Sequence, residues 1–187
     1  MEKFFDLFNH NLKTEHLELR ILKPTPENAK LLWNAVKNEN PDDFKYSPII
    51  PKSEQEALET MQKQDSYCQN TGVCWYIFHN NNLIGFQRIH YWESNKTLQF
   101  SEVWLVRSAW GKGFNKELHD FIEKIAFQDL KAHRATRQCM ADNVRSKKSI
   151  ENSGYHLDGR MRDLNLMPDG TWMDHLSFSK LDTEYKG

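Results

Sequence analysis

Between residues 98 and 126 the chain reads as an apolar strand, a glycine-bearing turn and an amphipathic helix, and this succession restricts the possible folds more than any other feature. The strand is Leu98–Val106, and the turn is Trp110-Gly-Lys-Gly-Phe-Asn115. The helix predicted after the turn carries apolar residues at helical spacing on one face, namely Phe114, Leu118, Phe121, Ile122, Ile125 and Ala126.

Such a turn predicts an anion-binding site. Backbone N–H groups at the start of a helix point outward, and the helix dipole favours negative charge there. Gly111 and Gly113 let the backbone come close to an anion without a Cβ atom in the way. We therefore expect a phosphate or pyrophosphate of a nucleotide-derived cofactor, with purely steric glycines as the alternative interpretation.

Two common nucleotide motifs are excluded by the residues around the turn. The Walker A loop requires Lys and then Ser or Thr after its last glycine, but Phe114 and Asn115 follow Gly113. The dinucleotide-binding fingerprint requires a third glycine where this chain has Lys116.

Length and composition limit the class of protein. The 187 residues fit a single domain, 1–187, in which residues 1–14 are expected to form a loosely tied N-terminal arm. A net charge of −1 argues against a direct nucleic-acid partner held by bulk electrostatics. Neither a secretory signal nor a membrane-spanning run is expected. The three cysteines lack CxxC spacing and favour a reduced, cytoplasmic compartment.

The first half of the chain predicts two helices and four strands. Thr25-Pro26-Glu27 is a typical start for a helix over about 26–38, and Ser53 with Glu56 forms a capping box for a second helix over about 54–69. Alternation or apolar runs predict strands at 17–22, 73–79, 83–90 and 98–106, the middle two joined by Asn80-Asn81-Asn82.

After the amphipathic helix, residues 134–141 predict a strand parallel to 98–106, since a helix that packs back on the sheet forces that direction. Asp142 or Asn143 caps a short helix that ends at Gly154. Two final strands, about 155–163 and 171–180, flank the turn Met167-Pro168-Asp169-Gly170. The predicted fold is α/β (α+β), a mixed sheet with helices on both faces.

Three segments carry a family resemblance. They are Val103-Trp-Leu105 with Trp110-Gly-Lys-Gly-Phe114, then Asp142-Asn-Val-Arg-Ser146 through Asn152-Ser-Gly-Tyr155, then Asp169-Gly-Thr-Trp172-Met-Asp-His175. In this order and spacing they resemble the GNAT superfamily of acetyl-CoA-dependent N-acetyltransferases, and most closely its RimJ/RimL-like branch of ribosomal-protein N-acetyltransferases. The resemblance implies a largely antiparallel sheet with a central parallel strand pair, and a homodimer as one expected arrangement.

The resemblance also implies where acetyl-CoA binds as cosubstrate. The implied contacts are Leu105, Val106, Trp110, Gly111, Lys112, Gly113, Phe114, Asn115, Asn143 and Ser146. The turn holds the pyrophosphate, and a backbone N–H at the strand end points at the thioester carbonyl, where it stabilises developing negative charge. Trp110 and Asn115 depart from the family's Gln/Arg and Gly/Ala, and Asn115 adds a side chain near the phosphates.

The resemblance assigns Ser146 as the general acid for the leaving thiolate, with helix capping as the alternative role of Asn143 and Ser146. Tyr155 is a rival acid, but packing in the core is the favoured role for it. The branch carries its carboxylate base where this chain has Asn165, which cannot accept a proton. Glu102 is the best replacement, with an exposed or paired carboxylate as the alternative interpretation, although strand alternation places it on the opposite face from Leu105 unless a bulge intervenes.

Other residues are further candidates for the general base, for phosphate contacts and for the lining of the acceptor cleft. Asp163 and His90 are weaker candidates for the base. The short helix carries three basic residues, Arg145, Lys147 and Lys148, which either face solvent or meet a phosphate or an acidic acceptor. Three tryptophans are candidates for the acceptor cleft, namely Trp75, Trp92 and Trp104. No metal site is expected, and Cys139 is expected in the core.

The predicted activity is acetyl transfer from acetyl-CoA to a primary amine, with a protein N-terminal α-amine favoured. An α-amine is easier to deprotonate at neutral pH than a lysine side chain, which suits a chain without the family's base. The alternatives are a small-molecule N-acetyltransferase and a coenzyme-A-binding protein that has lost catalysis. The acceptor itself is set by variable loops, here about 38–53 and 163–172.

Overall fold

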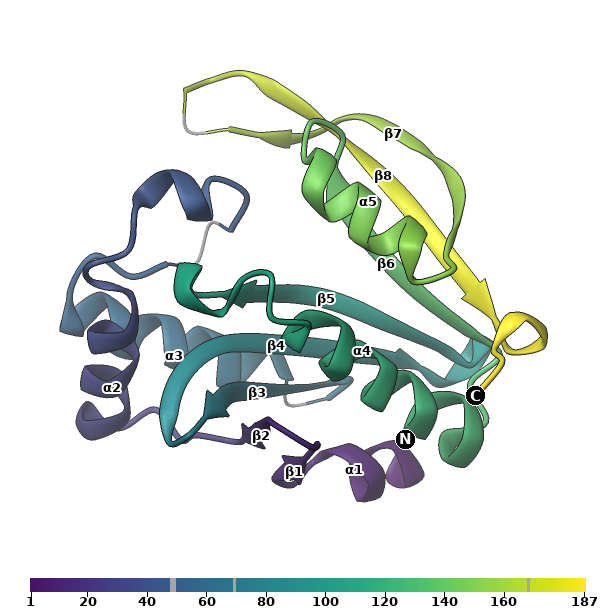
Figure 1. Cartoon of the computed structure of the whole chain (residues 1–187), viewed down its shortest axis with the longest axis horizontal. Helices are drawn as coiled ribbons and strands as arrows, with labels where there is room; N and C mark the ends of the chain where they lie inside the picture. The colour runs from purple at the N-terminus through teal and green to yellow at the C-terminus, as the bar shows by residue number, and fades with distance from the viewer. Residues whose placement is uncertain (48–49, 69, 168) are drawn as a thin grey trace.

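The computed structural model describes residues 1–47, 50–68, 70–167 and 169–187. Within these residues, strands pair into one sheet in the order β1-β2-β3-β4-β5-β6-β8-β7 (Figure 1). The strands are β1 (Leu12–Lys13), β2 (Glu18–Arg20), β3 (Gly72–His79), β4 (Asn82–Trp92), β5 (Thr97–Leu105), β6 (Arg134–Met140), β7 (His156–Leu166) and β8 (Trp172–Leu181). The α-helices are α1 (Glu2–Phe8), α2 (Pro26–Val36), α3 (Glu54–Cys68), α4 (Phe114–Lys124) and α5 (Val144–Asn152).

The sheet is mixed, as predicted. β5 and β6 are parallel, whereas the other neighbouring strands are antiparallel. The expected fold class, with a central parallel pair in a largely antiparallel sheet, is therefore confirmed.

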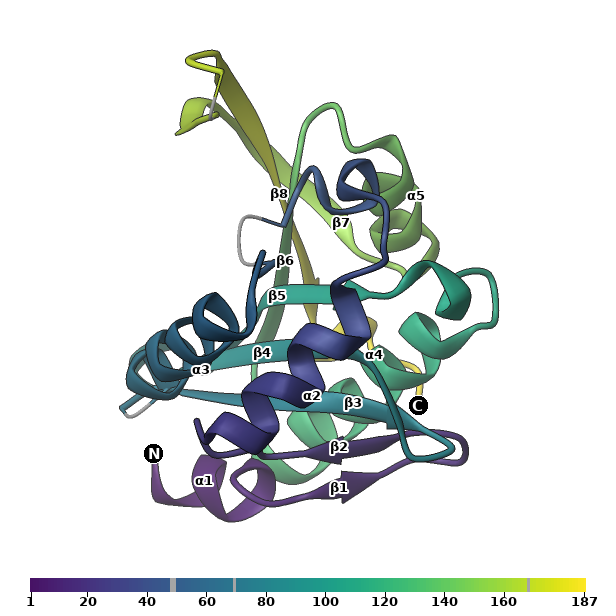
Figure 2. The same ribbon diagram turned by 90° about the vertical axis from the view of Figure 1, so that its left-hand side faces the viewer.

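Helices cover both faces of the sheet. Gln87 and Arg88 are successive residues of β4, so their side chains point to opposite faces. Gln87 Oε1 lies 3.1 Å from Nε2 of His119 on α4, while Arg88 Nη1 donates to Gln64 of α3 at 2.8 Å. One face is therefore covered by α4, with α1 and α5 on the same side, and the other by α3 and its neighbour α2 (Figures 1 and 2).

The parallel pair is short and then opens. β5 and β6 pair only over Thr97–Phe100 and Arg134–Arg137. Beyond this point β5 stays with β4 as far as the Gly85–Leu105 pair, and β6 stays with β8 as far as Met140. Because each strand keeps its antiparallel partner, a V-shaped gap separates them. An extra residue in β5, Ser101, forms a bulge where the gap begins.

Local signals form the elements that they predict. Thr25 caps α2 by accepting from the N–H of Asn28 at 3.3 Å, and Ser53 caps α3 by accepting from Glu56 at 3.1 Å. The Glu56 carboxylate accepts from the N–H of Lys52 rather than from that of Ser53, so the capping box is shifted by one residue. The hairpin at Asn80 and Asn81 takes positive φ angles of 49° and 61°, which suit a tight turn.

The C-terminal half differs from the prediction only at boundaries. The long helix changes to a π-helical segment at Ile125–Leu130 and ends at Lys131, which has a φ of 61°. Gly154 follows α5 with a φ of 78°, as a helix C-terminus favours. In the predicted Met167–Gly170 turn, Pro168 lies outside the described residues.

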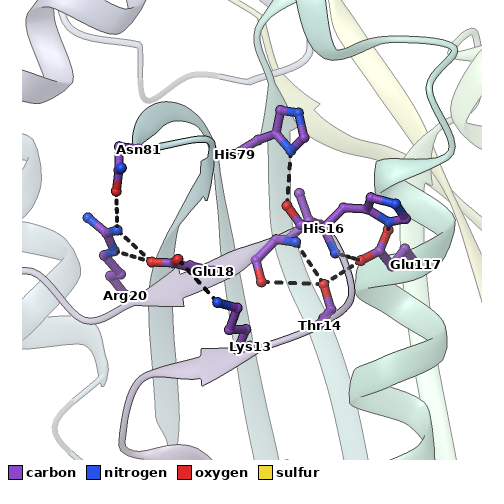
Figure 3. A network of polar contacts seen from close by, with 9 residues as sticks. Lys13, Thr14, His16, Glu18, Arg20, His79, Asn81 and Glu117 are labelled. Atoms are coloured by element: carbon purple, nitrogen blue, oxygen red, sulfur yellow. Dashed lines mark hydrogen bonds and ion pairs between the residues drawn. The ribbon is translucent and has the colours of Figure 1, made fainter.

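The N-terminal segment is not a loosely tied arm, so that expectation is wrong. Phe4 and Phe8 of α1 are completely buried in the core. Glu117 of α4 also ties the segment down by accepting from the Thr14 hydroxyl and from the N–H of His16, at 2.8 Å for the latter (Figure 3). Residues 1–14 therefore complete the sheet and the α4 face.

We expect Glu117→Gln to lower Tm by about 2–4 °C, because weakening these contacts removes about 1 kcal/mol from a domain of this size. Burial raises the pKa of Glu117, but the hydrogen bonds of Thr14 and His16 outweigh it and lower the pKa overall. The stabilisation is therefore present at neutral pH and is lost as the pH falls through that lowered pKa. Thermal melts with Glu15→Gln, an exposed carboxylate, as control test this, and equal Tm values would contradict it.

Candidate active site

A cavity of about 620 Å³ occupies the gap between β5 and β6. Its walls come from both sides of the sheet: Phe44, Glu102 and Trp104 on the α3 side, and Asn115 and Ser146 on the α4 side. The volume is that of a typical ligand site. Groups bound from opposite faces can therefore meet inside the gap.

The predicted glycine turn lies at the edge of this cavity. Gly111 and Gly113 line it and have φ angles of 72° and 83°, where glycine is strongly favoured. A Cβ added at either position would meet no atom within 4 Å, so the space in front of the turn is open. Gly113 is the N-cap of α4 and no side chain caps this helix, so its first N–H groups can bind an anion. The turn therefore offers open space and N–H groups to an anion.

The other residues of the turn differ in position. Phe114 and Asn115 line the cavity, and Asn115 Nδ2 donates to Ser149 Oγ of α5 at 3.4 Å. Lys112 is exposed between the two glycines and is not part of the cavity wall. Its side chain is free to approach an anion only from the solvent side.

Trp110 connects the turn to the end of β5. Its Nε1 donates to the carbonyl of Leu105 at 2.8 Å, which explains why a tryptophan can replace the family's polar residue here. The guanidinium carbons of Arg145 and Arg107 lie 3.5 Å and 4.4 Å from the ring centroid. Two positive charges are thus held beside the glycine turn.

The end of β5 presents backbone N–H groups to the gap. Val106 cannot contribute one, because its N–H donates to the Ile84 carbonyl at 2.8 Å and its side chain is buried. The implied coenzyme contact of Val106 is therefore corrected. Since N–H directions alternate along a strand, Leu105 and Val103 point theirs away from β4 and toward the gap. These two groups are the candidates for the thioester carbonyl.

Glu102 lies on the cavity wall in a partly desolvated setting. It pairs with Arg88 at 3.5 Å and accepts from Gln64 at 3.4 Å, and 10% of its side chain is exposed. Burial raises the pKa of Glu102, while the Arg88 charge opposes that rise. The bulge precedes Glu102, so Glu102 does lie on the opposite face from Leu105. Both nevertheless reach the cavity, because the cavity passes between the strands.

A buried polar chain supports the backbone at this bulge. The Arg137 guanidinium lies 2.6 Å from Nδ1 of His119, and His119 in turn contacts Gln87. Gln87 Nε2 then donates to the carbonyl of Glu102 at 3.0 Å. Burial lowers the pKa of His119 well below its usual value, so its ring is neutral at pH 7. The chain fixes the point where β5 leaves β6.

Unsatisfied polar atoms gather at the cavity. Seven buried side-chain N or O atoms lack a hydrogen-bond partner in the described part of the chain, and six belong to cavity-lining residues. Those six belong to Ser47, Arg88, Ser101, Glu102, Arg137 and His175. An unsatisfied buried polar atom costs about 1–3 kcal/mol, so their concentration here indicates a polar ligand.

Ser146 and Asn143 lie on the α5 wall. Asn143 Oδ1 accepts from the N–H of Ser146 at 3.1 Å, so the capping role is present, and both residues also line the cavity. Burial raises the pKa of the Cys139 thiol, and the neighbouring Ser146 hydroxyl opposes that rise. Cys139 is buried on β6, as expected.

Several sequence candidates lie elsewhere. Tyr155 is buried, with its hydroxyl donating to Glu123 at 2.8 Å. Asp163 is exposed, and His90 packs between Tyr67 and Trp92. None of these lines the cavity.

Only some of the candidate tryptophans and basic residues line the cavity. Trp104 and Arg145 line the cavity. Trp75 is fully buried, Trp92 is an exposed residue outside the cavity, and Lys147 pairs with Glu151 at 3.9 Å.

One residue at the site, His175, was not singled out by its sequence, whereas its partner Asn165 was expected only to replace the family's carboxylate base. Asn165 and His175 both line the cavity, and Asn165 Nδ2 lies 2.5 Å from Nε2 of His175. The two residues come from β7 and β8. His175 belongs to the third family-like segment, and that membership is the signal that could have indicated it.

In the described ranges no cluster of three or more His, Cys, Asp or Glu side chains is arranged to hold a metal ion. None of the helices described has the length and apolar character needed to cross a bilayer.

Comparison with known proteins gives a family match. The model of the acetyltransferase (GNAT) domain matches residues 17–156. The "Probable N-acetyltransferase YjcK" of Bacillus subtilis (strain 168) is 35% identical over 76 residues, which span 41% of this chain and 41% of that protein. Less than two thirds of that relative is therefore covered.

Solved structures share the fold at low identity. The structure of "a putative ribosomal-protein-serine acetyltransferase from Vibrio cholerae" has a TM-score of 0.74 at 18% identity, with 92% of this chain and 98% of that chain covered. The microcin C7 self immunity acetyltransferase MccE, in complex with acetyl-CoA and AMP, has a TM-score of 0.76 at 19% identity, with 89% and 93% covered. These likenesses establish the fold.

Proposed function

Because this chain belongs to the GNAT family of acetyltransferases, and therefore uses acetyl-CoA, we propose that it acetylates a protein N-terminal α-amine of the ribosomal-protein type. The observation that carries this proposal is Glu102, a desolvated carboxylate with one unpartnered oxygen at the cavity. The likeness in fold to a ribosomal-protein-serine acetyltransferase agrees with it.

The donor would bind on the α4 side of the gap. The N–H groups around Gly111 and Gly113 would hold its diphosphate, with Arg145 and Arg107 supplying positive charge nearby. The N–H groups of Leu105 and Val103 would then receive the thioester carbonyl and stabilise the negative charge that develops on its oxygen.

The acceptor would enter from the α3 side, where Glu102 faces the cavity. Glu102 takes a proton from the ammonium group, and the nitrogen lone pair then attacks the thioester carbon. When the carbon–sulfur bond breaks with its electron pair on sulfur, Ser146 donates a proton to the departing thiolate. Glu102 and Ser146 would therefore act on the substrate from opposite faces of the sheet.

The pKa of the acceptor decides between amine classes. An α-amine has a pKa near 7.7–8.0 and a lysine side chain one near 10.4, so neutralising lysine at pH 7 costs about 3.5 kcal/mol more. A single carboxylate, with its pKa raised by burial, remains a weak base for a lysine ammonium. The site therefore suits the α-amine.

Matched peptides test the proposal. One peptide has a free N-terminus and no lysine; the other has the same sequence with a blocked N-terminus and one internal lysine. We expect thiol release from acetyl-CoA at pH 7 to have a kcat/KM at least about 10-fold higher for the first peptide, since the pKa difference allows up to a few hundredfold. Equal rates, or a preference for lysine, would contradict an α-amine acceptor.

A small-molecule amine is the second candidate. Phe44, Tyr46 and Trp104 give the acceptor side of the cavity an aromatic lining that also suits a compact substrate. Turnover of a small amine with no turnover of either peptide would establish a small-molecule acceptor. Tight coenzyme binding without any turnover would instead indicate a binding protein.

A further inference from the structure

Acetylation of an amine requires two protons to leave the same nitrogen. The ammonium group loses one before attack, and the nitrogen is positively charged again once the new C–N bond has formed. The proposed function, on which this inference rests, assigns only the first proton, to Glu102. Ser146 is a weak acid, so its hydroxyl also needs a source that restores the hydrogen given to sulfur.

His175 lies on the acceptor side of the gap. Arg137 contacts His119 and so faces α4; Met140, three residues along β6, faces the other way. His175 is directly opposite Met140 in the β6–β8 pair and shares its face. Glu102, which pairs with Arg88, lies on that same face. The two side chains therefore approach the acceptor side from the two walls of the V.

The His175 ring is held at one nitrogen and open at the other. Asn165 contacts Nε2, whereas Nδ1 is buried and has no hydrogen-bond partner among the described residues. The side chain lines the cavity, and a substrate N–H pressed against this wall would give the buried Nδ1 the hydrogen-bond partner that it lacks. The Asn165 amide can offer either its N–H or its oxygen to the ring, so it tolerates both neutral tautomers.

An irregularity in β7 produces this contact. Met161 is opposite His175 and Asn165 is opposite Met173, so residues 162–164 bulge outward across from Asp174. Asp163 takes a φ of 49°, and its N–H donates to Asp174 Oδ1 at 2.8 Å. Bulges commonly re-aim side chains beside active sites. Here the bulge brings the Asn165 amide to the ring of His175.

We propose that His175, positioned by Asn165, is a second proton-transfer residue of this acetyltransferase. As the C–N bond forms with the nitrogen lone pair, the N–H bond breaks and its proton passes to Nδ1. The C–S bond then breaks with its electron pair on sulfur, and Ser146 gives sulfur a hydrogen. His175 then releases its proton to solvent and Ser146 takes a proton back from solvent, so both residues end the cycle as they began it.

The electrostatic surroundings suit this role. Burial lowers the pKa of His175, so the ring is neutral and ready to accept a proton at pH 7. Of the ionisable residues that line the cavity, Glu102 and Arg88 share the face of His175, and Asp43, Tyr46 and Arg145 lie near one another at another wall. Asp174, the next residue in the chain, points to the other face and pairs with Arg160, and the neighbours Met140 and Met161 carry no charge.

Two variants test the inference. In His175→Gln we expect kcat to fall about 100-fold while the coenzyme A Kd by calorimetry changes less than 2-fold. In Asn165→Asp the new carboxylate favours the imidazolium, so the acidic limb of the kcat profile should move up by about 1 pH unit. The pKa of His175, measured by NMR in the same variant, should move in parallel. His90→Gln, a buried histidine outside the cavity, serves as control.

The outcomes separate the two proposals. A His175→Gln variant with wild-type kcat overturns this inference alone, provided that the wild-type protein acetylates an amine. An unmoved acidic limb in Asn165→Asp, despite a raised NMR pKa, overturns it as well. A wild-type protein that acetylates no amine overturns the proposed function and this inference together.

Discussion

Replacing Glu102 by Gln is expected to lower kcat about 100-fold or more at pH 7, because a neutral amide of the same shape cannot accept the proton of the ammonium group. Coenzyme A affinity should stay near wild type, since Glu102 lies on the face opposite the glycine turn. Steady-state thiol release with an N-terminal peptide, together with calorimetry, measures both quantities. Glu54→Gln on α3 is the control, because Glu54 is exposed.

Stability supplies an independent check on Glu102. Burial raises its pKa in the folded protein, so the protonated form favours folding and that contribution is lost as the pH rises from about 4.5 through the folded pKa. Glu102→Gln removes this dependence. The variant should therefore gain Tm relative to wild type across that window. If kcat falls but the Tm difference does not change with pH, Glu102 is not the buried carboxylate described here.

Replacing Gly113 by Ala is expected to weaken coenzyme A binding at least about 10-fold. A non-glycine residue at positive φ costs roughly 1–2 kcal/mol. The turn can relieve that strain only by moving the N–H groups that face the diphosphate. Calorimetric titration with coenzyme A measures the loss.

Gly170 provides a matched control for this substitution. It has the same φ of 83°, and a Cβ there also meets no atom within 4 Å, but it lies in the turn before β8. Gly170→Ala should lose similar stability and keep its affinity for coenzyme A. Equal affinity losses in the two variants would mean that strain alone, and not the anion site, explains the effect.

Local signals carried most of the fold prediction. Thr25, the Asn80-Asn81 pair and Gly154 act on backbone within a few residues of themselves, so their effects can be read without the rest of the molecule. The parallel direction of β6 could be predicted because one helix, α4, connects β5 to β6 over a face of the sheet. The glycine turn is equally local, and its position at the cavity agrees with the sequence interpretation, although its ligand remains a prediction.

The remaining features depend on contacts between distant residues. The seven residues of α1 are too few for a strong periodic signal, and their burial follows from packing against the sheet. Val106 was expected to contact the coenzyme because it ends the predicted strand. Its N–H instead donates to the Ile84 carbonyl of β4, a contact between residues far apart in the sequence. Asn165 meets His175 only because of a bulge that strand alternation does not reveal.

The early parting of β5 and β6 also bears on how such a protein can change over evolutionary time. The connection between α2 and α3 contributes Phe44 and Tyr46 to one wall, and the loop before α4 contributes Gly111 and Gly113 to another. Mutations in the connection between α2 and α3 can therefore change amine specificity without altering the glycine turn. Because the sheet is split, the two walls of the cavity can evolve separately.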